Sequence, residues 1–120
     1  MPDLGRLTDP WYEAEFGGNA TPAGGFRRQG GAIEGAQLLF LWCPCAYGND
    51  ARAHGLIVPF RNPRGAPVPE HNFGIRSRDG QTKPRWEMSG TSLADLTLSP
   101  SIDVGDPSCW HGYVRNGLVT

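Results

Sequence analysis

The three cysteines of this chain constrain its fold more than any other feature. They lie in two short clusters, Cys43-Pro44-Cys45 and Cys109-Trp110-His111, and no cysteine occurs elsewhere in the sequence. Each cluster offers two metal-binding side chains one residue apart, and together the clusters form a Cys3His set. A structural zinc site requires four thiolate or imidazole donors in tetrahedral coordination. If the clusters meet in space, a single ion cross-links two segments that are distant in the sequence.

The spacing within each cluster suits a shared ion. Residues i and i+2 of an extended strand point to the same face, so Cys43 and Cys45 can bind together, and so can Cys109 and His111. Thiolate and imidazole donors favour zinc over hard cations. We therefore predict a structural Zn²⁺ held by these four side chains. Three alternatives stay open: His54 as the fourth ligand, a buried thiol cluster without metal, or a disulfide from Cys109.

Composition indicates why a metal cross-link would be useful. The 120 residues suit one domain, but they include 17 glycines and 11 prolines, and only 38% are hydrophobic. The usual share of roughly 45–50% apolar residues includes glycine, and because glycine makes up much of the apolar content of this chain, we expect a lean core. A structural ion binds only the folded state and so stabilises it.

The distribution of apolar residues predicts a mainly β, small single-domain antiparallel fold with zinc-stapled hairpins. Short apolar or alternating runs are bounded by glycine, proline and asparagine, and no long amphipathic helix is indicated. Proline at position 100 confines its strand to an edge or a bulge. Asn116-Gly117 between two apolar residues predicts a type I′ hairpin. The expected strands cover residues 37–42, 54–60, 72–76, 85–89 and 96–104.

The chain divides at about residue 35. Residues 1–35 are rich in glycine and proline and contain the aromatic residues Trp11, Tyr12, Phe16 and Phe26. Such aromatic anchors predict an extended N-terminal arm that lies on a surface, either its own or that of a partner. Residues 36–120 are expected to form the zinc-binding β domain.

Charge and hydropathy argue against several partners. The chain has 11 Lys and Arg against 12 Asp and Glu, for a net charge of −1. Without a basic field, nucleic-acid binding is not expected. The longest apolar stretch, over residues 36–45, is too short to span a bilayer. The first residues lack the apolar region of a signal peptide, so we expect a protein made in a reducing cytoplasm.

No established catalytic motif is present. Ser99-Pro100-Ser101 lacks the flanking glycines of a nucleophile elbow, and no histidine precedes it with a partner acid in a recognised order. We expect its hydroxyls to bond the nearby backbone. A metal-dependent hydrolase would need a carboxylate base, for which Asp50, Glu70 and Glu87 are candidates, but no His-Glu-x2-His motif supports it.

The last third of the chain carries a recognisable pattern, Leu96-Thr97-Leu98-Ser99-Pro100-Ser101-Ile102 followed by Cys109-Trp110-His111-Gly112 and the Asn116-Gly117 turn. With Cys43-Pro44-Cys45 and Trp86 upstream, residues 36–120 resemble a family of small uncharacterised phage and prophage proteins, sometimes mislabelled "ammonia monooxygenase". Two departures are the missing glycine between Cys109 and Trp110, and Ala46-Tyr47 where a glycine is usual. The resemblance implies a metal-binding domain of viral context and no particular reaction.

These observations favour a non-enzymatic zinc-binding structural or interaction protein. We expect residues 1–35 to bind a protein partner, such as a capsid or other virion component that the chain decorates or cements. Its location would be the cytoplasm of the bacterial host, or the virion. The alternatives are a zinc-dependent hydrolase and a zinc-ribbon-like accessory protein that binds nucleic acid.

Overall fold

The computed structural model describes residues 3–21, 25–28, 33–46, 54–65, 68, 70–76, 82–103 and 109–120. Within these ranges the chain is mainly β, as predicted, and its helical structure is a single 3₁₀ turn. No helix in the described part is long and apolar enough to cross a membrane. The elements are β1 (Gly5–Arg6), β2 (Glu15–Thr21), β3 (Gly25–Arg28), β4 (Leu38–Trp42), η1 (Pro44–Ala46), β5 (Gly55–Arg61), β6 (His71–Arg76), β7 (Thr82–Pro84), β8 (Trp86–Ser89), β9 (Thr97–Asp103), β10 (His111–Arg115) and β11 (Leu118–Val119).

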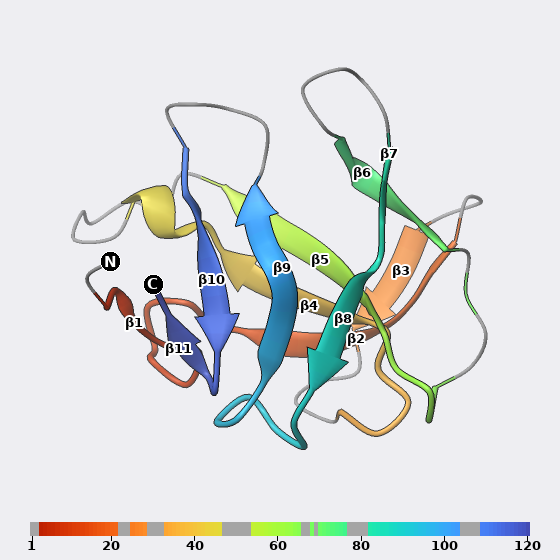
Figure 1. The fold of residues 1–120 in the computed structure, drawn as a ribbon, viewed down its shortest axis with the longest axis horizontal. Coiled ribbons are helices and arrows are strands. Elements are labelled where there is room, and N and C mark those ends of the chain that lie inside the picture. The colour runs from red at the N-terminus through yellow and green to blue at the C-terminus, as the bar shows by residue number, and fades with distance from the viewer. Residues whose placement is uncertain are drawn as a thin grey trace.

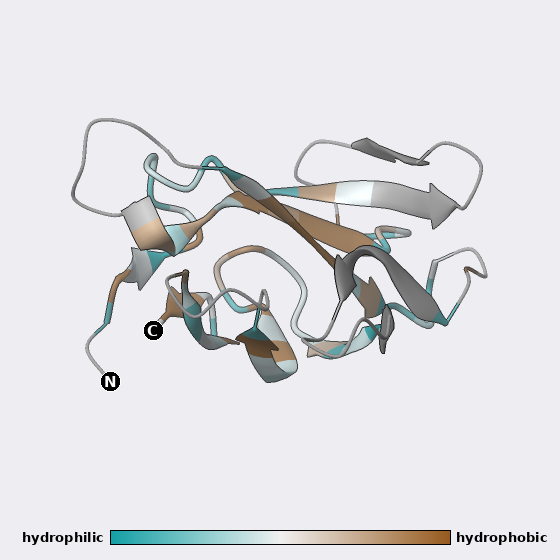
Figure 2. Ribbon diagram, turned by 90° about the horizontal axis from the view of Figure 1, so that it is seen from above, coloured by the Kyte–Doolittle hydropathy of each residue, from teal (hydrophilic) through white to brown (hydrophobic). Residues whose placement is uncertain are grey.

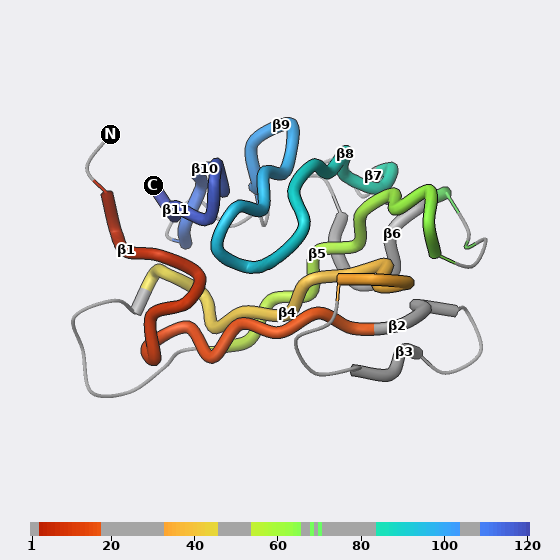
Figure 3. The backbone as a smooth tube through the Cα atoms, turned by 90° about the horizontal axis from the view of Figure 1, so that it is seen from below, coloured from red at the N-terminus to blue at the C-terminus, as the bar shows by residue number. Residues whose placement is uncertain are grey.

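Nine strands form one curled sheet with the order β1-β11-β10-β9-β8-β5-β4-β2-β3, and β6 pairs with β7 separately (Figure 1). Neighbouring strands are antiparallel except β5 and β8, which pair in parallel through Phe60 and Trp86. The curl brings β8, β9 and β10 over β2 and β4, so that the sheet encloses its own core from two sides (Figure 3). This curvature lets residues of β4 and β10 meet, although β5, β8 and β9 separate them in the sheet.

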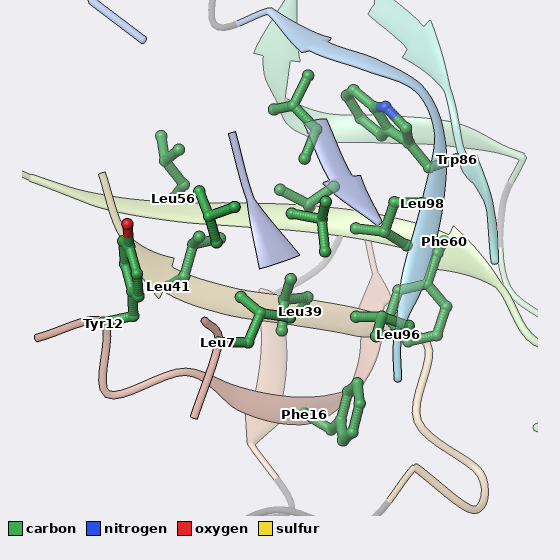
Figure 4. Close-up of a cluster of buried hydrophobic side chains, with 14 of the residues drawn as sticks. Leu7, Tyr12, Phe16, Leu39, Leu41, Leu56, Phe60, Trp86, Leu96 and Leu98 are labelled. Carbon is green, nitrogen blue, oxygen red and sulfur yellow. The ribbon is translucent and has the colours of Figure 1, made fainter. Parts of the chain in front are cut away.

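The core lies between the two layers of the curled sheet. The apolar run of β4 is buried along almost its whole length, as expected for a strand covered on both faces. Leu39 and Phe60 share the interior with Leu96 and Leu98 (Figure 4). Hydropathy follows the same division, because apolar residues concentrate in the central strands and hydrophilic ones in the connecting segments (Figure 2). A single core of modest size therefore supports the fold.

The described part of residues 1–35 belongs to this sheet. β1 pairs with β11, and β2 pairs with β4 through Phe16 and Leu39. Leu7, Tyr12 and Phe16 are buried in the core. Tyr12 and Phe16 therefore pack on their own protein. Near Asp9 the chain forms a non-helical turn, in which the Asp9 carboxylate accepts a hydrogen bond from the Trp11 backbone N–H at 2.9 Å.

Two local predictions for the last third are confirmed. Asn116 and Gly117 have φ angles of 53° and 75°, the two positive values that a type I′ turn requires. Pro100 lies in a bulge, because five residues of β9, from Leu98 to Ile102, face three residues of β10. β9 has neighbours on both sides, so the proline is tolerated by the bulge and not by an edge position.

Candidate metal centre and serine–histidine pair

Three thiols and one imidazole gather at one end of the curled sheet. The potential ligand atoms of Cys43, Cys45, His54 and Cys109 all lie within 4.8 Å of one another. Cys109 Sγ is 3.2 Å from Cys43 Sγ and 3.3 Å from His54 Nε2. Two donors at roughly 2.3 Å from a tetrahedral zinc ion are about 3.8 Å apart, a value between the shortest separations in the cluster and its 4.8 Å limit, so the cluster is close to the size of a single metal site. The group could bind a metal ion with little rearrangement.

Local structure explains how these four side chains converge. Cys43 directly follows β4, Cys45 lies in η1, and His54 directly precedes β5. The backbone N–H of Cys43 donates to the carbonyl of His54 at 2.8 Å, which fixes the two segments beside each other. Cys109 comes from the other layer, just before β10. The cluster therefore joins the β4–β5 layer to the β9–β10 layer.

Burial changes the chemistry of one ligand. Cys43 is 0% exposed, whereas Cys45 and His54 are exposed and Cys109 is half-buried. Burial raises the pKa of the Cys43 thiol to about 12, and hydrogen bonds with Cys109 and Cys45 add to the rise. The metal-free protein thus keeps this group protonated at neutral pH. Since a metal binds the thiolate, metal binding must release that proton.

The structure brings together three of the four predicted ligands, with His54 as the fourth member of the cluster. His54 is the alternative raised from the sequence. The i, i+2 geometry does not hold for Cys109 and His111, because Cys109 precedes the strand and His111 is the first residue of β10. Cys43 and Cys45 likewise meet through a 3₁₀ turn and not through an extended strand.

His111 instead forms a pair with a serine. Its Nε2 lies 3.1 Å from Ser101 Oγ, across the boundary between β9 and β10. Asp103 is the residue directly opposite His111 in the register, and it lies two positions from Ser101 on β9. The side chain of His111 is exposed, and those of Ser101 and Asp103 are half-buried. A hydroxyl bonded to an imidazole at the surface is the arrangement of a nucleophile and its general base.

Sequence reasoning missed this pair because it relied on a glycine-flanked elbow and on residue order. The available signal was the proline in a predicted strand. A bulge re-aims side chains and is frequent next to active sites. Here the bulge at Ser99-Pro100-Ser101 faces the start of β10, where the histidine of the second cysteine cluster lies.

Two tryptophans hold the backbone around the pair. Trp86 Nε1 donates to the carbonyl of Ser101 at 3.3 Å, and Trp110 Nε1 donates to the carbonyl of Thr120 at 3.1 Å. Gly112 makes room for the second contact, since a Cβ there would lie 2.0 Å from the Thr120 carbonyl oxygen. The residues before and after His111 are therefore fixed by close contacts.

The carboxylates considered for metal-dependent hydrolysis have other partners. Glu70 and Glu87 both bond the guanidinium of Arg61, on the edge of a cavity of about 590 Å³ that also contacts Arg85 and Met88. These ion pairs hold the pKa of Arg61 above its usual range. Asp50 lies outside the described residues. Neither described acid belongs to the cysteine–histidine cluster.

Comparison with known families gives a match in the last part of the chain. Residues 69–120 are similar to the model of the BubE family, described as a bacterial ubiquitination-like system serine protease. The matched segment contains Ser101, Asp103, Cys109 and His111. Neither the curated proteins nor the solved structures include a significant match to this chain.

Proposed function

We propose that this chain is a serine protease of a bacterial ubiquitination-like system, with Ser101 as nucleophile and His111 as general base. The observation that carries the proposal is the 3.1 Å contact between Ser101 Oγ and His111 Nε2. It lies within the segment that is similar to the BubE family model. The family match supports the class of reaction, and the contact with His111 supports the choice of Ser101 as the nucleophile.

The chemistry follows from the pair. Ser101 Oγ attacks the carbonyl carbon of an amide bond while His111 Nε2 takes the hydroxyl proton. The imidazolium then gives that proton to the leaving amine, and water hydrolyses the resulting ester with the histidine acting as base again. We assign to Asp103, which is opposite His111 in the register, the role of orienting the ring and stabilising its charged form.

The metal centre has a structural role in this proposal, and zinc is the metal that suits it. Three thiolates and one imidazole complete a tetrahedral shell, which leaves no coordination position for a reacting water. When bound, the ion would supply a cross-link between the two layers of the sheet. The reacting groups belong to β9 and β10.

A fluorophosphonate probe, which modifies activated serines, tests the proposal directly. We expect the zinc-loaded protein to be labelled at Ser101, as located by peptide mass spectrometry, and the Ser101→Ala variant to be unlabelled. Ser99→Ala is the matched control, because Ser99 is an exposed serine of the same bulge and should leave labelling unchanged. His111→Ala should slow labelling by at least 100-fold. Absence of labelling in the zinc-loaded protein, or labelling at another serine, would contradict the proposal.

The alternative is the non-enzymatic zinc-binding protein expected from the sequence, acting as a phage virion component. Both hypotheses include the metal centre, and they differ in whether Ser101 acts as a nucleophile. The virion partner stays a prediction, supported by the resemblance described above. An unreactive Ser101 together with binding to a capsid or tail component would favour it.

A further inference from the structure

We infer that the metal centre positions His111 for its reaction with Ser101, with Cys109 as the positioning residue. This inference rests on the proposed function and adds a regulation to it, namely that the reactivity of Ser101 depends on metal occupancy. The metal touches neither the serine nor the substrate in this scheme. Its effect passes along the backbone from Cys109 to the start of β10.

The first argument is the place of His111 at the end of its strand. It is the first residue of β10, and its ladder pairing with β9 begins at Asp103. After Gly112 the register shifts, so regular pairing near His111 covers two residues of β10. Strand ends have few ladder hydrogen bonds to hold them and open locally more easily than strand centres. The contact of Trp110 with Thr120 holds this segment toward β11, and a second constraint at Cys109 would hold it toward the end of β4.

The second argument is what Cys109 contacts. Its sulfur lies 3.2 Å from that of Cys43, a residue that is 0% exposed and whose backbone bonds His54 at 2.8 Å. An ion bound here would tie the residue two positions before His111 to the rigid end of β4 and β5. Without the ion, the same contacts are thiol hydrogen bonds, and sulfur is a weak donor and a weak acceptor. The constraint on β10 then weakens considerably.

The third argument is that the rest of the fold has its own support. Val58 and Phe60 of β5 and Leu98 and Val114 of β9 and β10 are fully buried or nearly so in the common core. Metal removal should therefore leave these strands folded and loosen the start of β10 locally. A misplacement of about 1 Å between reacting groups can cost roughly 100-fold in rate, so a local loosening is sufficient to lower reactivity.

The test uses His54, which is exposed and belongs to the cluster but not to the serine–histidine pair. Two variants of the full chain are compared with the wild type. The first, His54→Ala, removes a ligand, and the second, His54→Cys, replaces the imidazole with a thiolate. Zinc content is measured together with the rate of fluorophosphonate labelling at Ser101. Amide hydrogen exchange at residues 110–112 supplies a readout that is independent of activity. Amide hydrogen exchange at Leu39 and Val58, which are buried in β4 and β5, shows whether the core of the sheet stays folded.

We expect zinc-free His54→Ala to label at least 10-fold more slowly than the wild type and to exchange faster at residues 110–112, with Leu39 and Val58 still protected. His54→Cys should restore zinc, labelling and protection together. Equal labelling and equal exchange with and without zinc would overturn the inference and leave the proposed function intact. Loss of protection at Leu39 and Val58 would also overturn it, because the ion would then support the whole fold. If the wild type does not label at all, the proposed function fails, and exchange at residues 110–112 alone decides whether zinc orders His111.

Discussion

Cys43 Sγ and Cys109 Sγ lie 3.2 Å apart although 66 positions separate the two residues in the sequence. One belongs to the end of β4 and the other to the approach to β10, and three strands lie between β4 and β10 in the sheet. The contact therefore joins the two layers of the curled sheet, two positions before His111.

The first prediction concerns which histidine binds the metal. Cys43→Ser, Cys109→Ser and His54→Ala should each bind substantially less zinc than the wild type, because each removes a member of the 4.8 Å cluster. His111→Ala should keep one zinc per chain, since His111 bonds Ser101 instead. Elemental analysis of the purified proteins, with the spectrum of the Co²⁺-substituted forms, measures this. The reverse pattern, with zinc lost in His111→Ala and kept in His54→Ala, would restore the ligand set predicted from the sequence.

The second prediction is a pH dependence of metal affinity. Burial raises the pKa of Cys43 from 9.0 to about 12 in the metal-free protein, so this thiol is protonated throughout the neutral range. Zinc must displace the proton, and its apparent affinity should therefore rise as pH increases from 6 to 8. Calorimetric titration in buffers of different ionisation enthalpy counts the protons released. If zinc binding released no protons, Cys43 would have to be a thiolate already in the metal-free protein, which would contradict the prediction.

The same shift has a consequence for stability. A raised folded-state pKa stabilises the metal-free fold fully below about pH 9, the unfolded value, and this contribution is lost as the pH rises toward 12. The zinc-loaded protein should not lose stability in this way, because Cys43 is then already a thiolate bound to the metal. Denaturant unfolding at pH 8 and pH 10, with and without zinc, compares the two forms. If the metal-free protein were equally stable at both pH values, the predicted loss of stability with rising pH would be wrong.

The fold could be predicted from the sequence where local chemistry decides it. The apolar run at Leu38–Trp42 has no alternation, and it became a buried strand. Asn116 and Gly117 tolerate positive φ, and they form the predicted turn. By contrast, the pairing of β5 with β8 and the curl of the sheet depend on contacts between distant segments, which no local pattern encodes.

In the candidate site, too, the sequence predicts what local chemistry decides and does not predict contacts between distant segments. All three cysteines were identified because their chemistry is specific and their number is small. The choice between His54 and His111 could not be made, since it depends on where β10 begins and on a 3₁₀ turn after Cys43. The pairing of Ser101 with His111 depends on the register of two strands across a bulge, and no residue order reveals it.

The third prediction concerns a buried polar network that supports the end of β5. Asn62 is 4% exposed, and its side-chain amide donates to the carbonyls of Ile33 and Ala36, each at 2.9 Å. Asn62→Ala would remove both bonds, and although the Ile33 carbonyl still accepts from the Ala36 N–H at 3.0 Å, the loss should lower the free energy of unfolding by about 2 kcal/mol. Arg64→Ala is the control, because the exposed Arg64 side chain forms a 4.0 Å ion pair with Glu34 and should change stability by less than about 0.5 kcal/mol. Chemical denaturation gives both values, and equal effects would exclude the network as the cause.

The fourth prediction separates backbone strain from steric clash at the β10–β11 turn. Gly117 and Gly35 both have positive φ, at 75° and 78°. A Cβ on Gly117 would lie 2.4 Å from the carbonyl oxygen of Ala94, whereas nothing lies within 4 Å of a Cβ on Gly35. Gly35→Ala should therefore cost only the strain of the left-handed conformation, about 1 kcal/mol, and Gly117→Ala should cost about 3 kcal/mol. Thermal unfolding of the two variants measures the difference. A larger loss for Gly117→Ala than for Gly35→Ala would show that the clash with Ala94 adds to backbone strain at the turn between β10 and β11, and equal losses would contradict this.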